Sequence, residues 1–222
     1  MLYEVAHPLV WWVARWYCSL EVVGRDRVPA SGGVIVAANH VSYLDIPIVG
    51  CSLARRADFL AKAELFQHPV VGWFFKRLGG VPIRREGVDR NALAEVERRL
   101  AAGHVVVMYP EGTRSPDERL REPKPGVGML ALRTGVPVVP AYVAGTGEAW
   151  PAGARWLRTR PITVVFGEPM QWRQAELTTT DEMVIRRRYQ RVSQEIMDRI
   201  AELQREAHAR RLRQLNASTV TR

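Results

Sequence analysis

The apolar residues of this chain follow two patterns, one of short continuous runs and one of helical spacing. Continuous runs at residues 34–38 and 104–109 lie between turn-forming residues and are typical of buried strands. Further short strands are predicted at 58–61, 81–83, 136–143 and 162–166. Because the strands alternate with helices, the pattern predicts an α/β fold, a single domain with a largely parallel or mixed sheet flanked by helices.

The segments between these strands carry helical signals. Asn91 is a predicted N-cap for a helix that Gly103 ends. A shorter helix over 126–133 ends at Gly135. Two further apolar stretches, at 44–53 and 69–78, are also predicted to be helical. The stretch at 69–78 is too aromatic for an ordinary exposed helix.

The N-terminal segment, residues 2–23, reads as a helix rich in Trp and other large apolar side chains. Arg15 and Glu21 cut its apolar run well below the roughly 20 residues that a spanning helix needs. It has no basic leading region and no small-residue cleavage site, so a secretory signal is not expected. A Trp-rich helix of this kind suits the membrane interface, and packing on the protein's own core is the alternative.

The C-terminal segment, residues 181–212, is predicted to be one long amphipathic helix with a solvated charged face. The tail after Leu215 is expected to fray. The predicted organisation is therefore an N-terminal interfacial helix over 1–24, a central domain over 25–180, and a C-terminal helix and tail over 181–222.

The chain is basic, with a formal net charge of +9, and nearly all of its cations are Arg. A basic excess predicts anionic partners, which include nucleic acid, anionic lipid head groups and phosphorylated small molecules. Nucleic acid is disfavoured because no zinc-finger, RNP or basic-zipper pattern is present. The two cysteines show no metal-ligand spacing and suit a reducing compartment.

Candidate chemistry begins directly after the strand at 34–38, where His40 is followed five residues later by Asp45. Ligand sites of open α/β sheets form at the carboxyl ends of strands. Five residues is the wrong spacing for one helix face, so the pair meets only if a turn leads into a helix start. In that geometry the carboxylate holds Nδ1–H and leaves Nε2 free as a base. Ser42 lies between them, which keeps a covalent serine route open.

Three weaker patches follow. Residues 109–115 follow the strand predicted at 104–109. Within them, Arg114 offers a planar fork of donors for phosphate. The backbone around Gly112 can approach an anion closely. The remaining patches are a Gly-rich segment and a proline-containing hydrophobic segment, at 79–85 and 136–140.

In this order the patches resemble the motifs of the 1-acylglycerol-3-phosphate acyltransferase family of glycerolipid synthesis. That family carries an Asn-His-x4-Asp block, a Gly-rich block ending in Arg, a Glu-Gly-Thr-Arg block and a hydrophobic block built around proline. The matching positions are Asn39, His40 and Asp45, then 79–85, 111–114 and 136–140. The resemblance covers residues 32–143 and makes the central domain an acyltransferase domain.

The resemblance implies that His40 takes the proton from a glycerol hydroxyl as its oxygen attacks an acyl thioester, and that Asp45 orients the imidazole. It implies that other blocks hold the phosphate of a lysophosphatidic acid-type acceptor, through Lys62, Arg85, Glu111, Gly112, Thr113 and Arg114. No metal or other cofactor is expected, since the thioester of acyl-CoA or acyl carrier protein is already activated. Phosphatidic acid, a phospholipid precursor, would form at an anionic membrane surface, on the cytoplasmic face of the cell membrane.

Three alternatives stay open. Within the family, the acceptor can be another lysolipid or glycerol 3-phosphate. A lipid hydrolase would use Ser42 as a covalent nucleophile. A non-catalytic binder of anionic lipid would keep the fold without turnover.

Overall fold

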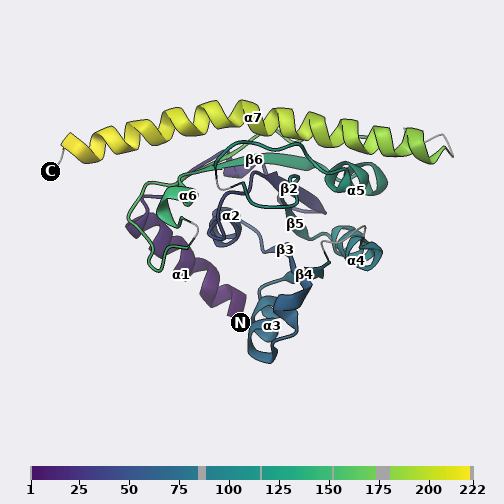
Figure 1. The fold of residues 1–222 in the computed structure, drawn as a ribbon, viewed down its shortest axis with the longest axis horizontal. Coiled ribbons are helices and arrows are strands. Elements are labelled where there is room, and N and C mark those ends of the chain that lie inside the picture. Colours follow the sequence, from purple (N-terminus) through teal and green to yellow (C-terminus); the bar gives the residue numbers. More distant parts are fainter. Residues whose placement is uncertain (1, 85–88, 116, 152, 174–180, 221–222) are drawn as a thin grey trace.

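A seven-stranded mixed sheet forms the middle layer of the protein (Figure 1). The computed structural model describes residues 2–84, 89–115, 117–151, 153–173 and 181–220. The strands lie in the order β1-β7-β6-β2-β5-β3-β4, and of these neighbouring pairs β6–β7 is antiparallel and the others are parallel. The strand bounds are β1 Glu21–Val23, β2 Val34–Ala38, β3 Ala57–Lys62, β4 Gly80–Ile83, β5 Val105–Met108, β6 Val138–Ala144 and β7 Thr163–Phe166.

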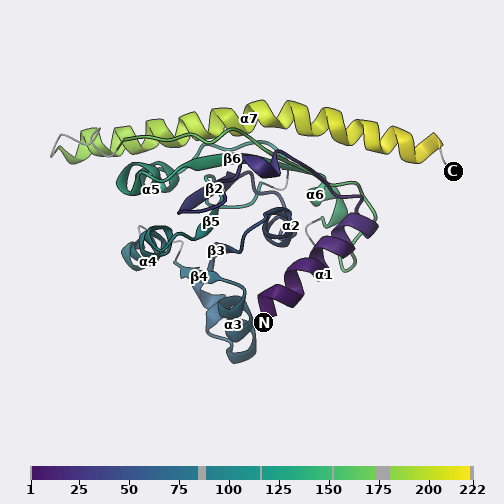
Figure 2. The same cartoon turned by 180° about the vertical axis from the view of Figure 1, so that it is seen from behind.

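Helices cover both faces of this sheet and give the fold three layers (Figures 1 and 2). Helices α4, α5 and α7 share one core with the sheet, and α1 and α2 share the other, with α3 beside the edge formed by β3 and β4. The helix bounds are α1 Leu2–Tyr17, α2 Asp45–Ser52, α3 Pro69–Arg77, α4 Arg90–Ala101, α5 Gly126–Thr134, α6 Thr146–Ala149 and α7 Glu182–Val220, with short 3-10 helices at Arg25–Arg27 and Ala63–Phe66.

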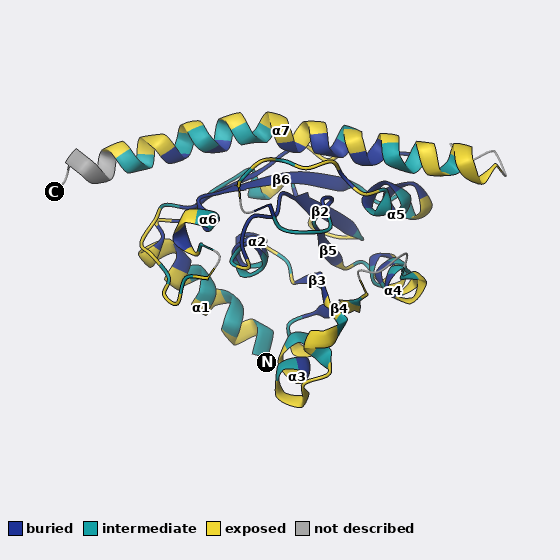
Figure 3. Cartoon of the chain, viewed as in Figure 1, coloured by how far each residue is buried: buried dark blue, intermediate teal, exposed yellow. Residues whose placement is uncertain are grey.

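The central strand β2 shows why the sequence has continuous apolar runs. Successive side chains of a strand point to opposite faces, so Val34 and Val36 enter the core under α1 and α2. Ile35 and Ala37 enter the core under α4, α5 and α7. All of β2 is buried, because helices cover both faces of the sheet at this point (Figure 3).

Helix α7 lies along β6 and α5. Its fully buried face includes Val192, Ile196 and Ile200. The apolar pattern predicts an end near Leu212 and a frayed tail after Leu215, but the helix continues to Val220. Tertiary contacts hold the C-terminal part of α7 in place. For example, Arg211 Nε donates to the Pro161 carbonyl oxygen at 2.9 Å. These contacts depend on residues far away in the sequence.

The N-terminal segment is not the single helix predicted over 2–23. Helix α1 ends at Tyr17, Ser19 adopts a positive φ of 45°, and the chain then enters β1. The Glu21 N–H donates to the Ile162 carbonyl oxygen at 2.9 Å, and β1 runs parallel to β7. The helix prediction was wrong here because strand pairing with a distant partner overrides local apolarity.

Helix α4 is capped by Asp89 and not by the predicted Asn91. Asp89 Oδ1 accepts the Ala92 N–H at 3.1 Å, and Oδ2 accepts the Arg84 N–H at 2.8 Å. Asn91 is the second residue of the helix. Asp and Asn are comparable caps, so the bond to Arg84, which lies outside the helix, decides between them.

The contact between α5 and α7 generates a stability prediction. A Cβ on Gly128 would lie 2.1 Å from the Tyr189 carbonyl oxygen, and the Gly128 N–H donates to Ser193 Oγ at 3.0 Å. We expect Gly128→Ala to lower the free energy of unfolding by about 2–4 kcal/mol in urea denaturation, because the two helices must separate. The matched control is Gly50→Ala in α2, where an added Cβ meets nothing within 4 Å. Equal losses in the two variants would contradict the prediction.

Candidate active site

The turn that follows β2 is anchored to the neighbouring strand β6 by Asn39. Its Oδ1 accepts the Val143 N–H at 2.7 Å and its Nδ2 donates to the Val143 carbonyl oxygen at 3.0 Å. The side-chain amide therefore continues the sheet's hydrogen bonding where β2 ends. This pairing directs the chain out of the sheet at its carboxyl edge, where the next residues form the site.

Asp45, the first residue of α2, organises the turn. Its Oδ2 lies 2.8 Å from His40 Nδ1 and accepts the backbone N–H groups of Val41 at 2.7 Å and Ser42 at 2.8 Å. Its Oδ1 accepts the hydroxyl of Thr146 in α6. The side chain is fully buried, so these four donors replace the water that an ionised carboxylate needs. The structure thus brings His40 and Asp45 together through a turn into a helix start.

The imidazole of His40 is held on two sides. Because an ionised carboxylate only accepts hydrogen bonds, the contact with Asp45 places the proton of a neutral imidazole on Nδ1. The ring stacks on Tyr109, with centroids 4.0 Å apart and planes 19° from parallel. Nε2 makes no hydrogen bond to any described residue, which leaves its lone pair available to take a proton.

Ser42 is not arranged as an activated nucleophile. Its hydroxyl donates to the Trp150 carbonyl oxygen at 3.0 Å and accepts the Leu44 N–H at 3.3 Å. The side chain is buried. A covalent serine route needs the hydroxyl bonded to its base, and here the hydroxyl is used in the turn itself.

Glu111 acts on the main chain of the site. Its Oε1 accepts the His40 N–H at 3.1 Å and its Oε2 accepts the Arg121 N–H at 3.2 Å. Burial raises the pKa of this carboxyl, and the two backbone donors act in the opposite direction. The His40 carbonyl oxygen in turn accepts the Ser115 N–H at 2.7 Å. The loop after β5 is therefore bonded to the backbone of His40 on both sides.

The rest of this loop presents cations. Gly112 has a φ of +68°, and a Cβ there would lie 2.9 Å from the side chain of Lys124. The Arg114 guanidinium lies over the ring of exposed Tyr43, 3.7 Å from its centroid, and pairs with no carboxylate among the described residues. Thr113 lies between Gly112 and Arg114 in the sequence and is half-buried. Lys124 and Arg114 therefore offer positive charge beside the His40 turn.

The remaining two predicted residues are less well connected to this centre. Lys62 ends β3, which is separated from β2 by β5. Its exposed ammonium group lies 3.7 Å from Glu64. Because β2, β5 and β3 are parallel, Lys62 lies at the same edge of the sheet as His40. Arg85 lies outside the described residues.

Two residues of the site were missed by the sequence analysis. Thr146 lies two residues beyond the end of β6, and a place just after a strand that neighbours β2 is a usable signal for site residues in open sheets. Tyr109 lay within a patch noted for its other residues. Burial raises the pKa of Tyr109 well above its ordinary value, and its hydroxyl has no hydrogen-bond partner among the described residues.

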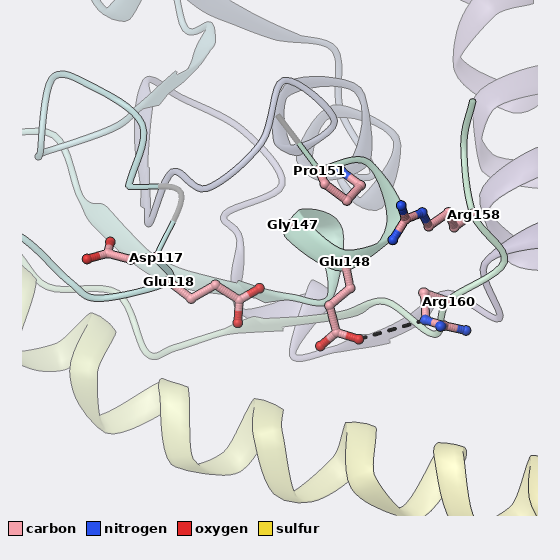
Figure 4. Close-up of a pocket in the computed structure, with 7 residues that line it drawn as sticks. All are labelled: Asp117, Glu118, Gly147, Glu148, Pro151, Arg158 and Arg160. Atoms are coloured by element: carbon pink, nitrogen blue, oxygen red, sulfur yellow. Dashed lines mark ion pairs between the residues drawn. The ribbon is translucent and has the colours of Figure 1, made fainter. Parts of the chain in front are cut away.

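A polar cavity of about 430 Å³ adjoins the turn (Figure 4). Its lining consists of Asp117, Glu118, Gly147, Glu148, Pro151, Arg158 and Arg160. Gly147 lies against the turn, since a Cβ there would be 2.8 Å from Val41 Cγ1. Glu148 pairs with Arg211 of α7 at 2.6 Å and with Arg160 at 3.9 Å, and the Arg211 contact lowers the pKa of this carboxyl. The Glu148–Arg211 pair therefore joins α6, next to the His40 turn, to α7.

No cluster of three His, Cys, Asp or Glu residues in the described part of the chain has an arrangement that could hold a metal ion. No helix in it combines the length and apolarity required to cross a bilayer.

Comparison with known proteins assigns the family. The sequence model of the family described as Acyltransferase matches residues 19–144. Those residues include the His40–Asp45 turn, the loop after β5 and strand β6. The chain therefore belongs to this acyltransferase family.

Two curated relatives of this chain carry the names of lipid acyltransferases. A chloroplastic 1-acyl-sn-glycerol-3-phosphate acyltransferase of Brassica napus is 34% identical over 163 residues, which cover 71% of this chain and 46% of that protein. A lyso-ornithine lipid O-acyltransferase of Pseudomonas aeruginosa is 34% identical over 137 residues, 60% of this chain and 52% of that protein. This chain spans about half the length of such curated relatives.

A solved structure shares the fold. The crystal structure of the 1-acyl-sn-glycerophosphate acyltransferase PlsC from Thermotoga maritima aligns with a TM-score of 0.71 and 28% sequence identity. The alignment covers 91% of this chain and 79% of that one. The similarity thus extends well beyond the residues matched by the family's sequence model.

The unpartnered Tyr109 hydroxyl yields a prediction. We expect Tyr109→Phe to raise the free energy of unfolding by about 1 kcal/mol, because it removes a buried polar group without a partner and keeps the ring that stacks on His40. Tyr142→Phe is the matched control, since the Tyr142 hydroxyl lies 3.3 Å from His208 Nε2. Chemical denaturation of both variants decides the point. A loss of stability in Tyr109→Phe as large as in Tyr142→Phe would refute it.

Proposed function

We propose that this protein is a 1-acylglycerol-3-phosphate O-acyltransferase. It moves a fatty acyl group from the thioester of acyl-CoA or acyl carrier protein to the hydroxyl of lysophosphatidic acid and produces phosphatidic acid. The observation that carries the proposal is the His40–Asp45 pair at the carboxyl end of β2, with Nε2 unengaged among the described residues. The names of the Brassica napus relative and the Thermotoga maritima structure support the acceptor.

In the proposed reaction His40 Nε2 removes the proton of the acceptor hydroxyl as the oxygen forms a bond to the thioester carbonyl carbon. The carbon–sulfur bond then breaks, and the imidazolium returns the proton to the leaving thiolate. Asp45 keeps the ring oriented and stabilises its positive charge between these two steps. The thioester is already an activated acyl donor, so the scheme uses no metal and no further cofactor.

The acceptor phosphate is assigned to the loop after β5. Arg114 and the backbone at Gly112 are the proposed contacts, with Thr113 beside them and with Lys62 and Arg85 as further cations. Glu111 is proposed to act by positioning, because backbone N–H groups occupy both of its oxygens. Lyso-ornithine lipid is a second acceptor to test, since the Pseudomonas aeruginosa relative carries that name.

A lipid acceptor requires the enzyme to work at a membrane surface, which we place on the cytoplasmic face. Exposed apolar side chains support a membrane contact, because many of them belong to α1 and α3, and α3 lies near the N-terminal end of α1 (Figures 1 and 2). Those of α1 and α3 include Trp12, Trp16, Val70, Trp73 and Phe74.

The base assignment is tested by thiol release from acyl-CoA, with and without lysophosphatidic acid. Replacing a general base typically costs about 10²–10⁴-fold in rate, and we expect a loss of that size in His40→Ala. His104→Ala is the matched control, because His104 also pairs with a buried carboxylate, Asp58 at 2.7 Å, but at the amino end of β5. Its rate should stay at the wild-type level.

Other outcomes separate the alternatives. Thiol release that does not depend on acceptor would identify a hydrolase. Lipid binding without turnover for any acyl-CoA, acyl carrier protein or acceptor would identify a binding module. Equal activity of His40→Ala and wild type would refute the proposed base.

The hydroxyl of Thr146 gives a second prediction, because it donates to the Asp45 oxygen that His40 does not use. A hydrogen bond to a charged group contributes about 1.5–3 kcal/mol, so Thr146→Val should lower kcat at least about tenfold and leave KM for the thioester unchanged. Thr146→Ser keeps the hydroxyl and should retain most of the activity. Equally poor Val and Ser variants would assign Thr146 a steric role instead.

A further inference from the structure

An apolar groove of about 750 Å³ lies between the N-terminal helix α1 and the loop that precedes β7. Its lining is Trp12, Val13, Trp16, Tyr17, Trp156 and Leu157, and we call these residues the tryptophan surface. The two segments are bonded to each other, since the Tyr17 hydroxyl donates to the Leu157 carbonyl oxygen at 3.0 Å. Only the fold brings Trp156 beside α1, since the intervening chain contains most of the sheet.

The three tryptophans of this surface are largely exposed. The exposed fraction is 65% for Trp12, 89% for Trp16 and 83% for Trp156. Large aromatic side chains grouped in this way usually mark an interaction site, since isolated exposed residues are common but contiguous apolar patches are not.

Arginines accompany the tryptophans along both segments. Arg15 precedes Trp16 in α1, and Arg155 and Arg158 flank Trp156 and Leu157. All three arginines are exposed, and none pairs with a carboxylate among the described residues. Tryptophan at head-group depth with arginine beside it is the combination that favours the interface of an anionic bilayer.

Two further observations favour a bilayer over an enclosed ligand. Trp16 and Trp156 leave most of their area in solvent, whereas a site for a single acyl chain would bury its walls. In addition, the exposed Trp73 and Phe74 belong to α3, and α3 lies near the N-terminal end of α1 (Figures 1 and 2). One flat membrane can therefore contact α1 and α3 together.

We infer that the loop around Trp156 is a second membrane-docking element, which inserts into an anionic bilayer together with the C-terminal half of α1. This rests on the proposed function only in that both require a lipid surface. Docking through two segments fixes the orientation of the domain, because two separate contacts prevent rotation about either one. It would hold the protein at the depth from which its acceptor is drawn.

The experiment is co-sedimentation of the full chain with vesicles of phosphatidylcholine and phosphatidylglycerol, compared with vesicles of phosphatidylcholine alone. No substrate is present, so a failure of the proposed chemistry does not affect the result. We expect Trp156→Ser to weaken binding about tenfold, since one large aromatic side chain is lost from the interface. Trp156→Phe should retain most of the binding.

Two more variants make the test specific. Arg155→Gln should weaken binding to the anionic vesicles about fivefold and leave binding to neutral vesicles unchanged. Met183→Ser is the matched control, because Met183 is 62% exposed but lies in the first turn of α7, at the end of that helix far from α1 (Figure 1). Its binding should equal that of the wild type.

Two results would overturn the inference. Wild-type binding by Trp156→Ser would show that the loop does not enter the bilayer. If that variant also shows a raised KM for long-chain but not short-chain acceptors, the groove is an acyl-chain site instead. Circular dichroism of each variant confirms that the fold is intact before binding is compared.

Discussion

The compensation of one buried charge, the carboxylate of Asp45, is the constraint on which the site depends. A carboxylate removed from water is stable only where donors take the place of water. Here the donors are His40 Nδ1, two backbone N–H groups of the turn and the Thr146 hydroxyl. They come from the turn after β2 and from α6, while Asp45 itself begins α2. Satisfying this single charge therefore fixes three segments relative to one another and orients the imidazole as a consequence.

The same arrangement connects the site to the outer layer of helices. Helix α6 carries Thr146 toward Asp45 and Glu148 toward Arg211, whose guanidinium also bonds the Pro161 carbonyl oxygen before β7. On the other side, Glu111 holds the His40 backbone to the loop after β5. The imidazole is thus supported from α2, α6 and β5, all on a rigid sheet. Such support suits a catalytic geometry, because small displacements of a base are costly in rate.

The two outer layers have different surfaces for a physical reason. Helix α7 buries one stripe against β6 and α5 and exposes mostly charged residues, so it satisfies its apolar face within the chain. Helix α1 buries Ala14 but leaves Trp12 and Trp16 in solvent, and α3 exposes Trp73. No partner among the described residues covers these exposed side chains. A lipid surface would supply that partner.

The sequence by itself determined the α/β class, the strands β2 to β7, the helices α2 to α5 and the candidate pair of His40 and Asp45. Continuous apolar runs, capping glycines and ordered motifs are local signals, so they can be read from the sequence without knowledge of the fold. Tertiary structure alone decided that residues 21–23 form an edge strand and that α7 continues past Leu212. It also placed Thr146 against Asp45, Tyr109 against His40, and Trp156 in the groove beside α1. Each of these depends on a hydrogen bond or contact with a partner far along the chain. No pattern within a short window contains that partner, which is why the sequence could pair His40 with Asp45 but could not name the groups that hold them in place.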